Sequence, residues 1–219
     1  MIGAPRVHWR RTESTNERAR ELAAAGAPHG TLVTASAQTA GRGRQGREWT
    51  APPGTAVLMS VVLRRFSEAL PLAAAVAVCD AIPVDCGIKW PNDVQLEGRK
   101  LAGILVEGRP QEGWAVLGVG LNVAAAPEGL DATSLSAHGV EASVEAVLGN
   151  LVCALERRLG RDGGSILAAW RERDVLLGRE VRWREGRGVA AGIDDSGALL
   201  VETRNGPVTL HAGEVHLQP

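Results

Sequence analysis

Three glycines alternate with three arginines in the segment GRGRQGREW, residues 41–49. Glycine lets a backbone approach a ligand closely and exposes amide groups to anions. The guanidinium groups of Arg42, Arg44 and Arg47 add planar donors that suit phosphate or carboxylate. Trp49 offers an aromatic face or an apolar latch. Taken alone, the charge pattern favours a solvated, disordered basic loop, with an anion site as the alternative.

A second candidate is KWPNDV, residues 89–94, at the end of an expected strand. Lys89 is placed to touch a phosphate or a charged reaction centre, and Asp93 to orient it or hold a metal. The alternative is a turn in which Asn92 and Asp93 satisfy the local backbone.

The third candidate is GVGLN, residues 118–122, in a glycine-rich strand. Asn122 ends that strand, where its amide could read an adenine or a ribose. The alternative is a purely structural glycine strand, which another part of the chain approaches closely.

The composition restricts where an anion can bind. The chain has 219 residues, a formal net charge of −1, and 22 arginines but only two lysines, Lys89 and Lys100. Near neutrality argues against broad nucleic-acid binding, so an anion site must be local. No apolar run approaches the roughly 20 residues of a membrane helix, and no signal-peptide stretch begins the chain. We therefore expect a cytoplasmic protein with no membrane partner.

Several common site types do not fit the sequence. There is no GxxxxGK[ST] phosphate loop, and an isolated GxGxxG-like run is a weak signal. The five histidines are scattered, so a transition-metal enzyme is not expected. Cys79, Cys86 and Cys153 show no CxxC spacing and are expected to be buried, reduced thiols.

Alternating short elements must position these segments. Helices are expected from Ser14 or Thr15, which can cap the first, to about residue 25, and over 68–82, 144–159 and 164–176. Strands are expected over 31–37, 56–63, 84–89 and 113–123, with a hairpin that turns at 97–99. The long connection between the first two strands is of the kind that is functional or disordered.

After Gly178 the sequence changes to short β-like runs separated by Asp-Ser-Gly and Asn-Gly turns. About 40 residues are few for an independent domain, so we expect this part to pack on the first. The expected domains are 1–177 and 178–219.

In combination these segments resemble the biotin protein ligase family. The ordered matches are STN (14–16), QTAGRGRQGREW (38–49), KWPNDV (89–94), GRKLAGILVE (98–107) and GVGLNV (118–123), with ATSL (132–135) as a weaker addition. The resemblance implies an α+β fold: a mixed β-sheet with flanking helices, related to class II aminoacyl-tRNA synthetases, plus a small C-terminal SH3-like β-barrel.

The resemblance also implies a reaction. Biotin's carboxylate attacks the α-phosphate of Mg²⁺-bound ATP to give biotinyl-5′-adenylate, and a lysine of a biotin carboxyl carrier protein then takes the biotinyl group. Adenylation brings two anions together, so cations must offset their repulsion. The mixed anhydride must also be shielded from water by a loop that closes over it. The glycine–arginine segment is thus expected to be mobile when empty and ordered over the intermediate.

Residue roles follow from the same resemblance. Arg44 and Lys89 are the expected catalytic residues, with Arg44 retaining the intermediate. Biotin is expected to contact Ser14, Thr15, Asn16, Gln38, Gly41, Arg42, Gly43, Arg44, Lys89, Gly103, Ile104 and Leu105. The nucleotide is expected to contact Arg44, Arg47, Trp49, Lys89, Asn92 and Asn122. The metal ligands are unknown, and Lys100 is as well explained by a surface or structural role.

Two departures from the family pattern matter. Gln45 stands at a loop position that is often basic, and only 13 residues precede STN. That leaves no room for the winged-helix DNA-binding domain of the family's repressors, so a ligase without repressor function or nucleic-acid partner is expected. The family includes monomers and dimers, which leaves a homodimer open. The alternatives are a lipoate or octanoate ligase and a non-catalytic biotin- or nucleotide-binding regulator.

Overall fold

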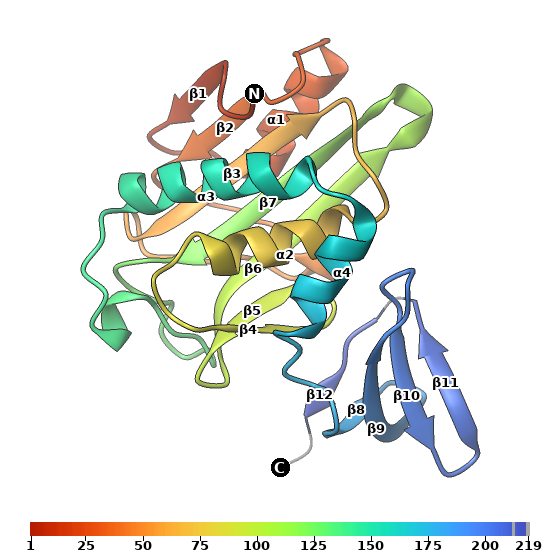
Figure 1. The fold of residues 1–219 in the computed structure, drawn as a ribbon. Helices are drawn as coiled ribbons and strands as arrows, with labels where there is room; N and C mark the ends of the chain where they lie inside the picture. Colours follow the sequence, from red (N-terminus) through yellow and green to blue (C-terminus); the bar gives the residue numbers. More distant parts are fainter. Residues whose placement is uncertain (212, 218–219) are drawn as a thin grey trace.

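A mixed sheet of seven strands forms the centre of the larger part of the protein. The computed structural model describes residues 1–211 and 213–217. The strands are β1 (Arg6–Trp9), β2 (Leu32–Ala35), β3 (Ala56–Leu63), β4 (Gly87–Lys89), β5 (Asp93–Leu96), β6 (Arg99–Arg109) and β7 (Trp114–Asn122). Their order is β1-β2-β3-β7-β6-β5-β4 (Figure 1). β1 and β2 run parallel, and every other neighbouring pair is antiparallel, which confirms the predicted mixed sheet.

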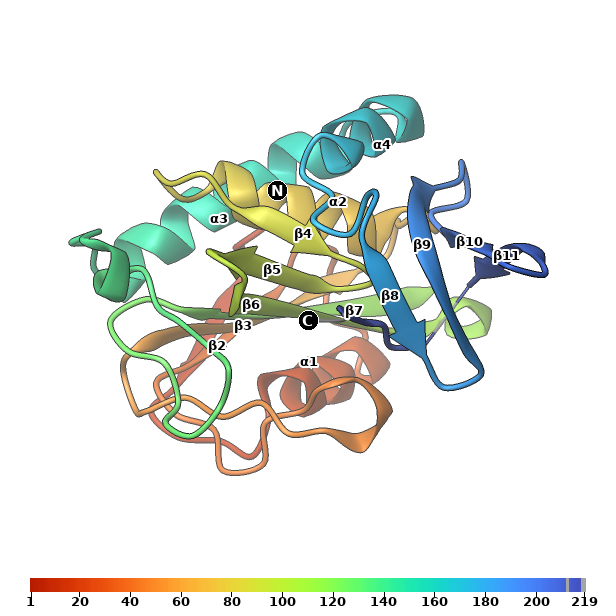
Figure 2. The ribbon, with the colours of Figure 1, turned by 90° about the horizontal axis from the view of Figure 1, so that it is seen from below.

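Helices cover both faces of this sheet. They are α1 (Thr15–Ala24), α2 (Leu70–Asp80), α3 (Val144–Leu159) and α4 (Gly163–Arg171). Helix α1 lies on one face, and α2, α3 and α4 lie on the other (Figure 2). Helix α2 is apolar all round, as a helix enclosed between the sheet and other helices must be. Short 3₁₀ turns occur at Arg44–Gly46, Pro110–Glu112 and Ser136–His138.

The element predictions are confirmed with three differences. Only Gly87–Lys89 of the expected strand 84–89 is a strand. Helix α4 ends at Arg171 rather than near 176, because the chain beyond it bonds to β4 instead: the Ile88 amide donates to the Arg173 carbonyl at 2.7 Å. Strand β1 was not predicted; its four residues alternate exposed and half-buried positions at the sheet's edge.

The C-terminal part is a second, antiparallel sheet. Its strands are β8 (Glu180–Trp183), β9 (Gly186–Ile193), β10 (Leu199–Thr203), β11 (Gly206–Leu210) and β12 (His216–Leu217), in the order β11-β10-β9-β8-β12. The β-rich character predicted after Gly178 is confirmed. The SH3-like barrel form and the boundary between residues 177 and 178 stay predictions.

This second sheet packs on the first part, as expected for so short a segment. Val181, Leu199 and Val201 belong to the same buried apolar cluster as the residues of α2 and β7. The Trp90 indole Nε1 donates to the Gly197 carbonyl at 3.0 Å. Arg171 donates to the Ile193 carbonyl at 3.0 Å. The two parts therefore share one core.

The three cysteines, all within the described ranges, are free thiols. Cys79 is buried and Cys86 is half-buried, but Cys153 is exposed, so the prediction that all three are buried is wrong for Cys153. It lies on the outer face of α3, beside the apolar stripe that contacts the core. No helix in the described ranges is long and apolar enough to cross a membrane.

Candidate active site

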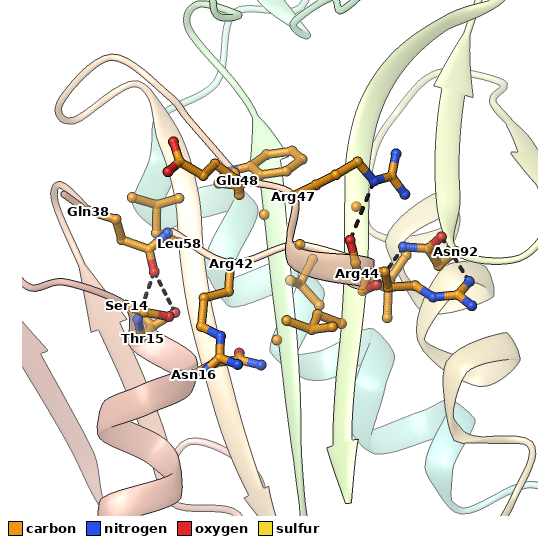
Figure 3. A pocket seen from close by; sticks show the side chains of 18 of the residues that line it. Ser14, Thr15, Asn16, Gln38, Arg42, Arg44, Arg47, Glu48, Leu58 and Asn92 are labelled. Carbon is orange, nitrogen blue, oxygen red and sulfur yellow. Dashed lines mark hydrogen bonds between the residues drawn. The ribbon is translucent and has the colours of Figure 1, made fainter. Parts of the chain in front are cut away.

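A cavity that opens to solvent lies between the glycine–arginine segment and the sheet. It is walled by the start of α1, the connection between β2 and β3, and strands β3, β6 and β7 (Figure 3). The lining residues are Ser14, Thr15, Asn16, Gln38, Arg42, Gly43, Arg44, Arg47, Glu48, Trp49, Leu58, Met59, Asn92, Lys100, Gly103, Ile104, Leu105, Gly118, Val119 and Gly120. Most of the predicted site residues are thus brought together around one space.

Uncharged polar groups line one side of the cavity. Gln38 Oε1 accepts from the Thr15 amide at 2.7 Å and from the Thr15 hydroxyl at 3.0 Å (Figure 3). The Ser60 hydroxyl lies 2.6 Å from Asn16 Oδ1 and 2.9 Å from Thr15 Oγ1, so its single proton can serve either oxygen. Ser14 occupies the N-cap of α1, but its side chain makes no capping bond, which leaves its hydroxyl available to the cavity.

The glycines of β7 make room for side chains of the site. A Cβ on Gly118 would lie 2.0 Å from Asn16 Oδ1, and one on Gly120 would lie 2.3 Å from Trp49 Cε2. The glycine-rich strand was expected to admit a ligand or another backbone. In the structure it admits the Asn16 amide and the Trp49 indole instead.

The three loop arginines have different partners. Arg42 pairs with Glu17 at 2.7 Å and with Glu107 at 3.3 Å. Arg47 pairs with Glu214, which lies just before β12 in the C-terminal part. Although Arg42 was expected to meet an anionic substrate, protein carboxylates already occupy its guanidinium.

Arg44 differs from its two neighbours. Its Nη1 donates to Asn92 Oδ1 at 3.4 Å, and no carboxylate in the described ranges forms an ion pair with it (Figure 3). Burial lowers the pKa of the Arg44 guanidinium, and the charge of Arg47 adds to the effect. A half-buried, uncompensated cation on a cavity wall favours the binding of an anion.

Lys100 lines the cavity, whereas Lys89 does not. Lys100 Nζ lies 2.8 Å from Asp93 Oδ1 and 5.7 Å from the centroid of the Trp49 ring. Lys89 is not among the lining residues; it pairs with Asp93 in the β4–β5 register, and burial lowers its pKa. The scarcity of lysine singled out both residues, but only the fold shows which one faces the cavity.

Two other predicted residues lie outside the wall. Gly41 is buried, and a Cβ there would lie 2.2 Å from the Trp49 carbonyl oxygen, so its role is close packing of the loop. Asn122 is buried and donates to the Thr133 carbonyl at 3.0 Å. Its Oδ1 has no hydrogen-bond partner among the described residues. Prediction from sequence also missed the lining residues Glu48, Leu58, Met59, Gly118, Val119 and Gly120.

Comparison with known proteins identifies the class. Residues 9–123 match the biotin/lipoate A/B protein ligase family, and residues 176–217 match the biotin protein ligase C-terminal domain. The chain therefore belongs to the biotin/lipoate A/B protein ligase family, and the second match confirms its resemblance to the biotin protein ligases.

Individual relatives agree with this assignment. The chain is 40% identical to the biotin–[acetyl-CoA-carboxylase] ligase of Mycobacterium tuberculosis, over 94% of this chain and 87% of that protein. It is 36% identical to the bifunctional ligase/repressor BirA of Bacillus subtilis, over 99% of this chain and 75% of that protein. The biotin protein ligase of Aquifex aeolicus, solved with biotin and ATP, superposes with a TM-score of 0.84 at 27% identity, covering 97% of this chain and 98% of that one.

The packing of Trp49 on β7 gives a first prediction. Replacing Gly120 with alanine would place a methyl group inside the indole, so Trp49 must leave its place. We expect trypsin to cleave after Arg42, Arg44 and Arg47 several-fold faster in Gly120→Ala than in the unaltered protein, as followed by mass spectrometry.

Gly149→Ala is the matched control, since Gly149 is in α3 and a Cβ there meets no atom within 4 Å. Equal cleavage rates in the loop of both variants would show that Trp49 does not hold it.

Proposed function

We propose that this cavity is where the protein, a biotin protein ligase by family, joins biotin to ATP and passes the biotinyl group to a carrier lysine. The observation that carries the proposal is the division of the cavity into two ends. Amide and hydroxyl groups lie at one end, and Arg44, which forms no ion pair within the described ranges, lies at the other (Figure 3). Apolar side chains such as Leu58, Ile104 and Val119 lie among the lining residues.

Biotin has matching chemistry along its length. Its ureido head needs hydrogen-bond donors and acceptors, which Ser14, Thr15, Asn16 and Gln38 supply. Its ring sulfur and alkyl chain need apolar walls, and its carboxylate needs a cation. We assign the carboxylate end to Arg44 and Lys100, which replaces the sequence-based assignment to Lys89.

Two steps follow from this placement. In the first, a biotin carboxylate oxygen bonds to the α-phosphorus of ATP and pyrophosphate leaves. In the second, the carrier lysine nitrogen bonds to the biotinyl carbonyl carbon, AMP leaves, and the nitrogen loses a proton. Arg44 and Lys100 offset the negative charge that gathers in the first step, and their effect grows when the loop closes and excludes water from the cavity.

We place the nucleotide beside Trp49, with Arg47, Asn92 and Asn122 toward it. The Trp49 Nε1 and Asn122 Oδ1 atoms support this placement, because both are buried without a hydrogen-bond partner in the described chain. Magnesium is expected to accompany ATP. Within the described ranges no three His, Cys, Asp or Glu side chains gather to hold a metal, so we assign it no protein ligand.

A biotin carboxyl carrier domain is the proposed protein partner. The names of the relatives support it, since two of them are biotin–[acetyl-CoA-carboxylase] ligases. A cytoplasmic location remains a prediction from the sequence, which does not decide between a monomer and a homodimer.

Substrate-dependent exchange of pyrophosphate into ATP tests the function. We expect exchange with biotin and none with lipoate or octanoate. Exchange with lipoate or octanoate alone would favour the rival ligases, and biotin binding without exchange would favour a regulator.

Removing the uncompensated cation gives the next prediction. Arg44→Gly is expected to form biotinyl-adenylate at a measurable rate but to release it roughly 10- to 100-fold faster, the range for losing hydrogen bonds to a charged group. Rapid filtration with labelled ATP measures the release. The exposed Arg65 offers a control variant, Arg65→Gly, and release from Arg44→Gly at the rate of that control would refute the assignment.

The two lysines form a matched pair. Lys100→Met is expected to lower the rate of pyrophosphate exchange by about 100-fold or more, the scale for losing one charge-stabilising group. Lys89→Met removes an equal charge behind the wall and is expected to cost much less. A larger loss in Lys89→Met than in Lys100→Met would restore Lys89 as the catalytic lysine.

A further inference from the structure

A line of polar contacts, each within hydrogen-bond distance, connects the polar end of the cavity to the glycine–arginine segment. It passes from Gln38 through Thr15 and Ser60 to Asn16. From there the Asn16 Nδ2 donates to Glu107 Oε2 at 2.9 Å, and Glu107 Oε1 lies 3.3 Å from Arg42 Nη2. Figure 3 shows the Arg42 side chain extending from the loop toward Asn16.

Glu107 is the residue in this line that contacts both Asn16, at the polar end of the cavity, and Arg42, in the glycine–arginine segment. Its side chain is 21% exposed and lies near the C-terminal end of strand β6. Besides Asn16 and Arg42 it faces Arg20 at 3.5 Å. An ionised carboxylate can only accept hydrogen bonds, so the NH₂ group of Asn16 must point toward it. The Asn16 oxygen is then turned to Ser60 and the cavity.

Glu17 provides a natural comparison. It pairs with the same two arginines, Arg42 at 2.7 Å and Arg20 at 3.2 Å. It is more exposed, at 38%, and the structure gives it no hydrogen bond to Asn16. Glu17 can therefore hold the loop through Arg42, but it makes no hydrogen bond that would fix the orientation of the Asn16 amide.

We infer that Glu107 is a positioning residue that couples the Asn16 amide in the biotin-head pocket to the Arg42 guanidinium in the loop. The inference rests on the proposed function, because it takes biotin as the ligand of Asn16. Biotin bound by a correctly turned Asn16 holds Glu107 in place, and Glu107 in turn holds Arg42 and the loop. Binding of the head and closure of the loop are thus linked through one carboxylate.

Glu107→Gln isolates this coupling with little change in shape. The amide keeps an oxygen for Asn16 but loses the charge that pairs with Arg42, and it can present its NH₂ to Asn16 instead. Glu17→Gln removes an equal charge from the same arginines and is the matched control.

A mutant cycle on biotin affinity tests the inference, with calorimetry on the full chain. Asn16→Ala and Arg42→Met are measured alone and together, in the unaltered protein, in Glu107→Gln and in Glu17→Gln. We expect the two substitutions to be non-additive by about threefold or more in the unaltered protein and in Glu17→Gln, as for residues in one network. In Glu107→Gln the two substitutions should act independently, so that the fold-change in biotin affinity of the double substitution equals the product of the two single fold-changes.

Loop protection gives a second, independent measurement. Biotin is expected to slow tryptic cleavage after Arg44 in the unaltered protein and in Glu17→Gln, but not in Glu107→Gln. An equal unfolding midpoint in urea for the two glutamine variants excludes a merely structural effect.

Additivity in the unaltered protein, or coupling that persists in Glu107→Gln, would overturn the role of Glu107 while leaving the ligase function intact. Absence of biotin binding by the unaltered protein would instead overturn the proposed function and this inference together.

Discussion

Arg44 carries a positive charge that the fold buries by half and leaves without a carboxylate. Burying an unpaired charge costs free energy, so such a residue persists where an anion will pair with it. Four nearby acids are paired with other cations: Glu17 and Glu107 with Arg42, Asp93 with Lys100, and Glu214 with Arg47. Because Arg42, Arg44, Arg47 and Lys100 line the cavity with Glu48 as the one acid among its described lining residues, positive charge is in excess there, in a chain whose formal net charge is only −1.

Glycines determine how closely the walls of the site approach one another. Asn16 can reach Ser60 and Glu107 because Gly118 has no side chain, and Trp49 can lie against β7 because Gly120 has none. The Trp49 ring then faces Lys100, and the attraction between a cation and an aromatic face helps to hold both. The position of Asn16 at the polar end of the cavity and that of Trp49 and Lys100 at the charged end therefore both depend on glycines of β7.

Much of this arrangement was predictable from the sequence, because local patterns determine local elements. The helix at STN and the turn at Glu97-Gly98 were expected from local patterns. The gathering of STN, Gln38, GRGR and KLAGIL around one space was expected only from the family resemblance. Side-chain direction was harder to predict. Lys89 and Lys100 lie on either side of Asp93, and no periodicity in the sequence reveals which lysine faces the cavity. The carboxylates that pair with Arg42 and Arg47 come from α1, from β6 and from the segment before β12, all distant in sequence, so a local charge pattern could not reveal them.

The long-range pairs give the glycine–arginine segment its function. Arg42 is held by Glu17 and Glu107 of the larger part of the chain, and Arg47 by Glu214 of the C-terminal part. Arg44 lies between these two attachments and contacts Asn92. Asn92 belongs to the turn before β5, and Trp90 of the same turn donates a hydrogen bond to Gly197 in the C-terminal part. A segment attached on both sides can present its middle arginine to the cavity, while its glycines still allow it to open. The C-terminal part thus contributes to the site by holding one end of the loop through Glu214, although Glu214 is not among the residues that line the cavity.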